Sequence, residues 1–294
     1  MKCQLCPRVC GADRTADETG YCGADASLRV ARAALHFWEE PPISGTRGSG
    51  TVFFSNCSLR CAYCQNVTIS TGQVGKAISV NRLAEIFLEL QEQGAHNINL
   101  VTPTHYVEAI MAALDLAHSA TPALHIPIVY NTSGYERVQT IQRLADYVDI
   151  YLTDYKYASP ELATRYSSAP DYPNVALVAL AAMVQAQGEY RLNAEGLLEA
   201  GVIVRHLLLP GHLDDSLEAL EAVFATVGNK VCYALMNQFT ALPTAPAELQ
   251  QRVREADYSK LIDFALDLGI TNSFMQEGET AEESFIPPFD LQGV

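Results

Sequence analysis

Three cysteines, Cys57, Cys61 and Cys64, form a Cys-x3-Cys-x2-Cys motif directly after a short β-branched and aromatic run. Thiolates at such short spacings hold iron–sulfur clusters. Three of them can bind three irons of a [4Fe–4S] cluster, and no fourth cysteine follows nearby for the last iron. Because an open coordination position distinguishes a reacting metal site from a structural one, the motif predicts a reactive cluster. The alternatives are a chance grouping of cysteines and a zinc site with a distant ligand.

A second group of four cysteines lies near the N-terminus, with the spacing Cys3-x2-Cys6-x3-Cys10-x11-Cys22. No charged and then apolar leader is visible, so we expect a cytoplasmic protein. There thiols stay reduced, and clustered cysteines bind metals rather than form disulfides. Four thiolates suit structural zinc and equally suit an additional iron–sulfur cluster that passes electrons inward. The segment is polar and would gain its stability from the metal.

The remaining composition indicates a globular protein with an acidic surface. The chain has 294 residues, of which 49% are apolar, and a net charge of −15. That charge repels phosphate backbones and anionic membranes, so we expect no nucleic-acid partner. The longest apolar run, 175–184, is too short to cross a bilayer, so we expect no membrane partner either. Prolines and glycines around residue 45 predict a boundary between a cysteine-rich metal-binding segment (1–45) and the rest of the chain (46–294).

After residue 50, short β-branched runs alternate with longer amphipathic patterns. This alternation predicts an α/β fold with a parallel sheet, either open or closed into a barrel. In both forms the loops at the carboxyl ends of the strands share one face, where the chemistry takes place. The expected strands are 51–55, 98–101, 126–130, 148–152, 202–208, 231–235 and 270–274, and the clearest expected helices are 80–93, 106–119, 136–143, 216–226 and 258–268.

The segment from Phe53 to Asn66 resembles the cluster loop of the radical S-adenosylmethionine superfamily. It is most similar to the activating enzymes of pyruvate formate-lyase and their uncharacterised AmmeMemoRadiSam-like relatives, which also begin with a cysteine-rich segment. The resemblance implies a partial (β/α)6 TIM-like barrel. It also implies that the open iron is chelated by S-adenosylmethionine, which a low-potential electron donor of the flavodoxin or ferredoxin type helps cleave to a 5′-deoxyadenosyl radical.

The same resemblance extends to further loops. Tyr63 occupies the place of a residue that flanks the adenine. Activating enzymes hold the methionine amino group with a Gly-Gly-Glu-Pro loop after the second barrel strand. This chain has Thr102-Pro103-Thr104 there instead, so the two threonine oxygens are the candidates for that contact.

Three later strand ends also match loops that help place the cofactor carboxylate, sometimes with a monovalent cation. Asn131 and Thr132 belong to the first of these loops. Asp154 and Lys156 resemble an Asp-x-Lys motif, in which Asp supplies oxygen to a cation and Lys supplies a point charge to the carboxylate. Arg205 resembles an arginine that approaches the cofactor.

The function expected from this resemblance is abstraction of hydrogen from a protein substrate, as activating enzymes do. One alternative is a radical enzyme that acts on a small molecule or a peptide. The other is a non-enzymatic iron–sulfur electron carrier, which would leave the strand-end loops and the open iron without a role.

Overall fold

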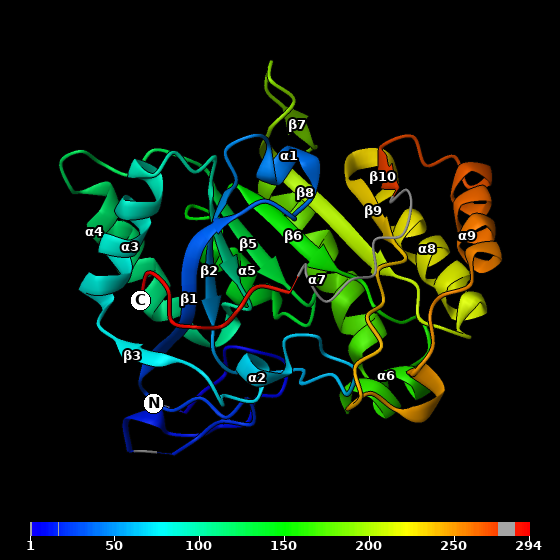
Figure 1. Cartoon of the computed structure of the whole chain (residues 1–294), viewed down its shortest axis with the longest axis horizontal. Coiled ribbons are helices and arrows are strands. Elements are labelled where there is room, and N and C mark those ends of the chain that lie inside the picture. The colour runs from blue at the N-terminus through cyan, green and yellow to red at the C-terminus, as the bar shows by residue number, and fades with distance from the viewer. Residues whose placement is uncertain (1, 17, 276–285) are drawn as a thin grey trace.

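A computed structural model describes residues 2–16, 18–275 and 286–294 (Figure 1). Its centre is one sheet with the strand order β10-β9-β8-β6-β5-β4-β2-β1-β3. Each neighbouring pair from β10 to β2 is parallel, which confirms the predicted α/β class and an open, barrel-like core. The parallel strands are β2 (Ser49–Phe54), β4 (Ile98–Val101), β5 (Ile128–Thr132), β6 (Ile150–Asp154), β8 (Leu198–Leu207), β9 (Cys232–Met236) and β10 (Ser273–Met275).

Helices connect the parallel strands and pack in sequence against one another. Helix α3 packs on α4, α7 packs on both α5 and α8, and α9 packs on α8. Among the described residues, no helix is long and apolar enough to cross a membrane. The α-helices are α1 (Pro41–Ser44), α2 (Val67–Ser70), α3 (Val80–Glu92), α4 (Val107–His118), α5 (Val138–Leu144), α6 (Pro160–Ser167), α7 (Tyr172–Gln187), α8 (Leu213–Val227) and α9 (Glu255–Asp267). The described residues also form the short 3-10 turns η1 (Arg14–Ala16), η2 (Thr104–Tyr106), η3 (Gly228–Lys230) and η4 (Ala247–Leu249).

Three strands were not predicted: β1 (Leu28–His36), β3 (Lys76–Ile78) and β7 (Arg191–Leu192). The nine-residue β1 pairs antiparallel with both β2 and β3, and it therefore extends the main sheet. The last described segment, 286–294, runs along β1 (Figure 1). The amide of Ala33 donates to the carbonyl of Gln292 over 2.8 Å, and the amide of Leu291 donates to that of Ala31 over 3.1 Å. The division at residue 45 stays a prediction.

Helix α6 is held at both ends by features that matter for the site. Ser159 is the N-cap of this helix, because its hydroxyl accepts the amide of Leu162 over 3.2 Å, and Pro160 begins the helix. At the other end Ser168 adopts a left-handed conformation with φ 49°, which ends the helix. This end of α6 lies against the loop that carries the three cysteines, since the carbonyl of Tyr166 accepts the amide of Ala62 over 2.8 Å.

Candidate active site

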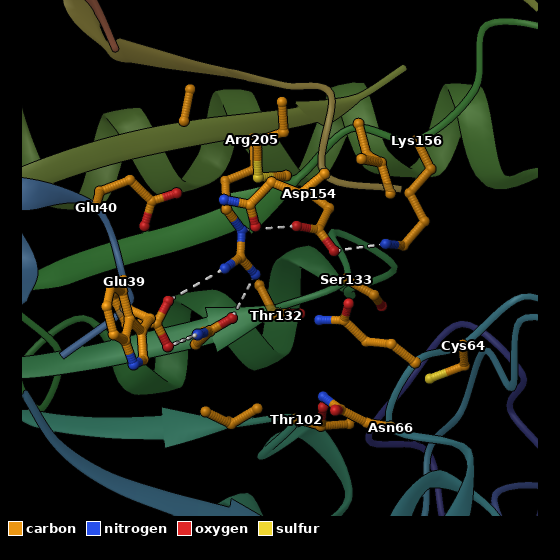
Figure 2. A pocket seen from close by; sticks show the side chains of 18 of the residues that line it. Glu39, Glu40, Cys64, Asn66, Thr102, Thr132, Ser133, Asp154, Lys156 and Arg205 are labelled. Carbon is orange, nitrogen blue, oxygen red and sulfur yellow. Dashed lines mark hydrogen bonds and ion pairs between the residues drawn. The ribbon is translucent and has the colours of Figure 1, made fainter. Parts of the chain in front are cut away.

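A cavity of about 530 Å³ opens at the carboxyl ends of the parallel strands. This volume is typical of ligand pockets. The loops after β2, β4, β5 and β6, together with β8 and β9, supply its walls, as expected for a parallel sheet (Figure 2). Of the predicted site residues, the cavity is lined by Cys57, Cys61, Tyr63, Cys64, Thr102, Asn131, Thr132, Asp154, Lys156 and Arg205.

The loop with Cys57, Cys61 and Cys64 is shaped by its own backbone. Arg60, between the first two cysteines, adopts a positive φ of 54°, a conformation that is uncommon for residues other than glycine. Leu59 is 1% exposed and anchors the loop in the core. The amide of Leu59 also donates to Cys57 Sγ over 3.4 Å. All three thiols are free, partly exposed and open to the same cavity.

This donor set fits an iron–sulfur cluster. Within the described ranges, no group of three or more His, Cys, Asp or Glu side chains, the N-terminal cysteines included, is arranged to hold one metal ion. A cluster is larger, and its thiolate ligands attach around its outside, which suits three sulfurs that line a common cavity. Cys57, Cys61 and Cys64 would hold such a cluster at the wall formed by their loop.

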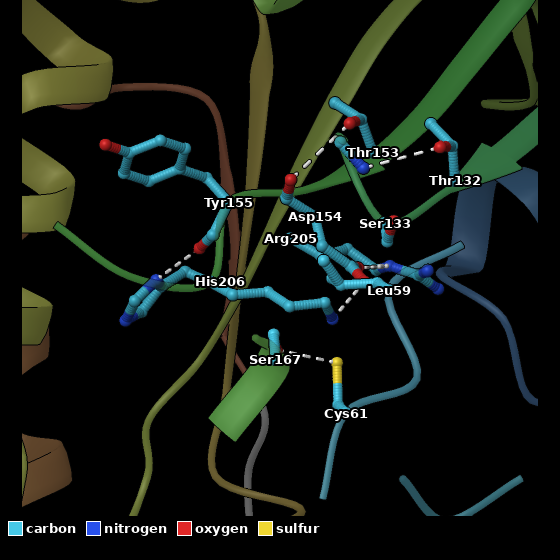
Figure 3. Close-up of polar contacts among 12 residues, drawn as sticks. Leu59, Cys61, Thr132, Ser133, Thr153, Asp154, Tyr155, Ser167, Arg205 and His206 are labelled. Carbon is cyan, nitrogen blue, oxygen red and sulfur yellow. Dashed lines mark hydrogen bonds and ion pairs between the residues drawn. The ribbon is translucent and has the colours of Figure 1, made fainter. Parts of the chain in front are cut away.

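A chain of hydroxyl groups leads from the cavity wall to Cys61. Ser167 donates through Oγ to Cys61 Sγ over 3.1 Å (Figure 3). The Tyr157 hydroxyl lies 2.9 Å from Ser167 Oγ and 2.8 Å from the hydroxyl of Tyr63. Tyr63 is 8% exposed, and its ring packs edge-on against Tyr157 and Tyr166. The aromatic wall therefore holds Tyr63 at the cavity next to the cysteine loop.

Asp154 links two cations at the base of the cavity. Its Oδ1 accepts from Arg205 Nε over 2.9 Å, and its Oδ2 accepts from Lys156 Nζ over 2.6 Å (Figure 2). Burial alone would raise the pKa of Asp154, but Lys156 and Arg205 outweigh it and hold this pKa below its ordinary value. Asp154 is therefore ionised at neutral pH. Both of its oxygens already contact cationic side chains, and its role as a ligand of a monovalent cation stays a prediction.

The loop after β5 reaches this network because of one glycine. Gly134 has φ +79°, and a Cβ there would lie 2.2 Å from the carbonyl oxygen of Asp154. A side chain could not be accommodated, so glycine permits the close approach of the two loops. Asn131 lies within β5 itself and accepts from Arg205 Nη2 through Oδ1 over 2.7 Å. The sheet and these loops together bring the predicted residues Asn131, Asp154, Lys156 and Arg205 to one place.

Sequence reasoning missed two acidic residues in the cavity, Glu39 and Glu40. Arg205 Nη1 lies 3.4 Å from Glu39 Oε2, and Asn99 donates to Glu39 Oε1 over 3.0 Å. Burial raises the pKa of Glu40 to about 7, and its buried Oε2 has no hydrogen-bond partner among the described residues. Both precede Pro41, and in the sequence they mark only the expected boundary. No local signal indicates that they meet a strand more than 160 residues away.

A third missed carboxyl, Glu136, lies beneath two of the predicted loops. Its Oε1 accepts from Thr104 over 2.5 Å and from Thr132 over 2.6 Å. Glu136 is 2% exposed, and burial raises its pKa to about 7. Thr102 and Thr132 line the cavity, whereas Thr104 is turned toward Glu136 and does not. The signal that could have found Glu136 is its position two residues after the loop glycine Gly134.

The N-terminal cysteines lie near one another in a segment that contacts the loop of Cys57, Cys61 and Cys64. A Cβ at Gly20 would lie 3.3 Å from Cys22 Sγ and 3.5 Å from Cys10 Sγ. Three of the sulfurs have a backbone amide from two residues further on directed at them. The pairs are Arg8 to Cys6, Ala12 to Cys10 and Ala24 to Cys22. Each amide lowers the pKa of its thiol, but burial raises the pKa of Cys6 to about 12 and also raises that of Cys22, so of these three only Cys10 has a pKa below its ordinary value. Cys3 is the fourth free thiol, and metal binding here stays a prediction.

Comparison with known proteins identifies the family. The model of the Radical SAM superfamily matches residues 51–223, more than half of the chain. The chain belongs to the radical SAM superfamily. Membership implies an enzyme that cleaves S-adenosylmethionine with radical chemistry, and members typically use a [4Fe–4S] cluster and need a reductant. The matched region contains the cysteine loop and every predicted cofactor-binding residue.

The chain is similar in sequence to a known protein and in fold to a solved structure. An uncharacterized protein of Methanocaldococcus jannaschii is 26% identical over 277 residues, which cover 90% of this chain and 74% of that protein. The crystal structure of Streptococcus suis SuiB bound to precursor peptide SuiA is similar in fold, with a TM-score of 0.50 and 12% identity. That match covers 76% of this chain but only 46% of SuiB, so this chain spans less than half of SuiB.

Proposed function

We propose that this radical SAM protein abstracts a hydrogen atom from a protein or peptide substrate, in the manner of an activating enzyme. Cys57, Cys61 and Cys64 would hold the [4Fe–4S] cluster and leave one iron for S-adenosylmethionine. The cluster and the cofactor together would supply a 5′-deoxyadenosyl radical. The observation that carries the proposal is the cavity of about 530 Å³, which three free thiols share with the network of Asp154, Lys156 and Arg205.

The residues of this network would orient the cofactor. Lys156 and Arg205 carry the positive charge that a methionine carboxylate requires, and Asp154 holds both of them in place. Thr102 offers a hydroxyl oxygen to the amino group from the neighbouring wall, whereas the Thr132 hydroxyl donates to Glu136. Tyr63 would flank the adenine, because its ring lies at the wall beside the cysteines. Thr104 and Glu136 would support these loops from behind rather than touch the cofactor.

The rim of the cavity supports a substrate that enters from solvent. Phe37 and Trp38 line the cavity, yet they are 51% and 64% exposed. Exposed aromatic side chains at a cavity mouth are typical of surfaces that bind other molecules. An extended segment of a polypeptide could pack on these rings and pass one residue into the cavity. SuiB holds a precursor peptide, and we propose the same broad class of substrate for this chain.

The test is the formation of 5′-deoxyadenosine. Anaerobically reconstituted protein receives S-adenosylmethionine and a low-potential reductant, and the products are analysed by mass spectrometry. We expect 5′-deoxyadenosine and methionine even without substrate, because small hydrogen donors can enter the open cavity. Cys61→Ala is the matched control and should give none. No product from the wild-type protein would contradict the proposal, and equal product from both proteins would point to contamination.

The substrate class is tested in a second experiment. A set of peptides deuterated at the α-carbon of glycine is added to the same reaction in ordinary water. Transfer of deuterium into 5′-deoxyadenosine would support abstraction from a polypeptide backbone. If the peptides neither transfer deuterium nor speed cleavage, while a pool of small metabolites does, then the substrate is a small molecule.

A further inference from the structure

Arg8 joins the N-terminal cysteine-rich segment to the loop of the candidate cluster. Its Nε donates to the carbonyl of Ser58 over 3.0 Å, and its Nη2 donates to that of Ser167 over 2.9 Å. A third bond runs from Nη1 to the carbonyl of Ser168. The guanidinium also lies 4.2 Å from the ring centroid of Tyr21. Ser58 lies between Cys57 and Cys61, so one side chain contacts the cysteine loop and helix α6 at once.

The two carbonyls that Arg8 contacts lie at the C-terminal end of α6, where Ser167 is the last helical residue and Ser168 is the C-cap. Carbonyls at a helix C-terminus lack intrahelical partners and carry a partial negative charge. A cation with several fixed donors satisfies them and fixes the position of the turn. The Ser167 hydroxyl, which donates to Cys61 Sγ, is carried by this same turn. Arg8 therefore holds the backbone of the residue that carries this hydroxyl.

The position of Arg8 depends in turn on the N-terminal segment. Arg8 lies in the turn between Cys6 and Cys10, and the amide of Val9 donates to the carbonyl of Cys6 over 3.1 Å. The segment docks on the barrel through other bonds as well. Thr140 donates to the carbonyl of Leu5 over 2.7 Å. Any metal held by Cys6 and Cys10 would also fix the turn that carries Arg8.

A hydrogen bond to a thiolate ligand changes the reduction potential of an iron–sulfur cluster. The donor stabilises the added negative charge of the reduced state and thus raises the potential. We propose that Arg8 and Ser167 are positioning residues that set the reduction potential of the candidate cluster through the hydrogen bond to Cys61. The inference rests on the proposed function, because it requires Cys61 to be a cluster ligand. It adds a role for the N-terminal segment in tuning that cluster.

The test is a redox titration of the reconstituted full-length protein, monitored by electron paramagnetic resonance without S-adenosylmethionine. Ser167→Ala should move the midpoint potential to a more negative value, so that the ratio of reduced to oxidised cluster at a fixed potential falls several-fold. Arg8→Ala should shift it in the same direction. Arg165→Ala is the matched control. Arg165 lies on the same helix, is 61% exposed and pairs with Glu248, so its removal should leave the potential unchanged.

Two further variants test whether Arg8 acts by positioning the Ser167 hydroxyl or through its own positive charge. Arg8→Lys keeps the positive charge but not the three fixed donors, and it should shift the potential nearly as far as Arg8→Ala. In the Ser167→Ala background, Arg8→Ala should add little, because the hydroxyl that it positions is already absent. A wild-type potential in Arg8→Lys, or an undiminished effect of Arg8→Ala in that background, would show that Arg8 acts through its charge and would overturn the inference.

The titration of Ser167→Ala tests the role of the hydrogen bond, and cluster assembly in the wild-type protein tests the proposed function. If Ser167→Ala binds a full cluster and titrates like the wild type, the inference is wrong, whereas the cleavage of S-adenosylmethionine is unaffected by that result. If the wild-type protein assembles no cluster on Cys57, Cys61 and Cys64, both fail together. Iron and sulfide content, measured on each variant before the titration, tells these cases apart.

Discussion

Asp154 and Arg205 occupy paired positions on the neighbouring parallel strands β6 and β8. The register places both side chains at the same level of the sheet, and Arg205 Nε donates to Asp154 Oδ1 over 2.9 Å. Because the pair is built on strands rather than on flexible loops, its geometry is set by the sheet itself. The two residues therefore form a fixed base on which Lys156 and Asn131 are arranged.

This arrangement predicts that Arg205→Ala and Asp154→Ala weaken the binding of S-adenosylmethionine. The first variant removes a cationic partner of the cofactor carboxylate, and the second releases both cations from their positions. Loss of one charge-assisted hydrogen bond costs roughly 1.5–3 kcal/mol, or about a ten- to hundred-fold drop in affinity. Equilibrium binding to the reconstituted protein measures the effect.

The control for these variants is Arg191→Ala, which removes an exposed arginine that pairs with Glu199 away from the cavity. We expect this variant to bind the cofactor normally, and we expect the absorption of the cluster to be intact in all three proteins. Unchanged affinity in both site variants would move Asp154 and Arg205 out of the cofactor site.

The two cysteine groups are expected to be metallated independently. The variant with Cys57, Cys61 and Cys64 all changed to Ala should lose one cluster, or about four irons, because no thiolates remain for it. Cys22→Ser should remove the N-terminal metal and leave that cluster in place. Elemental analysis also identifies this metal. About four irons with zinc in the wild type indicate a zinc site, and about eight irons indicate a second cluster.

Cys232→Ala serves as the control for the metal counts. This thiol is 2% exposed within strand β9, where burial raises its pKa to about 12. It should act as a small apolar side chain, and its variant should keep every metal. If the triple variant retained all of its iron and sulfide after the N-terminal cysteines had also been changed, the cluster assignment would be wrong.

Because the pKa of Glu136 is raised in the folded protein, we expect the free energy of unfolding to depend on pH. Burial raises its pKa to about 7 in the folded protein, against an ordinary value of 4.5. Below pH 4.5 both states are protonated. Between pH 4.5 and 7 the unfolded state releases its proton first, so the free energy of unfolding decreases as the pH rises. The shift corresponds to about 3 kcal/mol, which is lost by the time the pH passes 7.

Glu136→Gln isolates this effect, since the amide cannot ionise but can still accept from Thr104 and Thr132. Denaturant unfolding at pH 5 and pH 8 should therefore show a smaller loss of stability in the variant than in the wild type. Glu40 is present in both proteins and cancels from the difference. An identical pH dependence in the two proteins would mean that Glu136 is ionised throughout.

The backbone conformation of Thr102 predicts that replacing this residue with glycine stabilises the protein. Its φ of 58° lies in the left-handed region, which is unfavourable for a β-branched residue. The strain costs roughly 1–2 kcal/mol, and glycine would add roughly 0.5–1 kcal/mol of backbone entropy on folding. Thr102→Gly should thus raise the free energy of unfolding by up to about 1.5 kcal/mol. Thr153→Gly, within strand β6, is the control and should lower it.

The sequence predicts the parallel core well because its signals are local. The seven expected strands overlap the observed β2, β4, β5, β6, β8, β9 and β10, and residues Val80–Glu92 form α3 within one residue of the expected range. Strand β1 was missed because Arg29 and Arg32 interrupt its apolar residues. Those arginines pair with Asp25 and Asp290, and the second partner lies at the other end of the sequence.

The candidate site was predictable to the extent that its residues follow strands. Asp154 and Arg205 come from strand ends, whose common face is a general property of parallel sheets. Glu39 comes from a segment that reaches the cavity only after β1 has paired with β2, and no short-range pattern encodes that approach. Thr104 was expected in the cavity because of its place in a loop, but its hydroxyl donates to Glu136, and only the position of Glu136 after Gly134 could have indicated that carboxyl.

The segment 286–294 occupies the backbone groups of β1 next to its short pairing with β3. Exposed strand edges are templates on which further chains can add by hydrogen bonding. The bonds of Ala31 and Ala33 to this segment satisfy groups that would otherwise face solvent beside an apolar sheet. The last described residues thus protect the molecule against edge-to-edge self-association, a hazard for any enzyme whose barrel is left open.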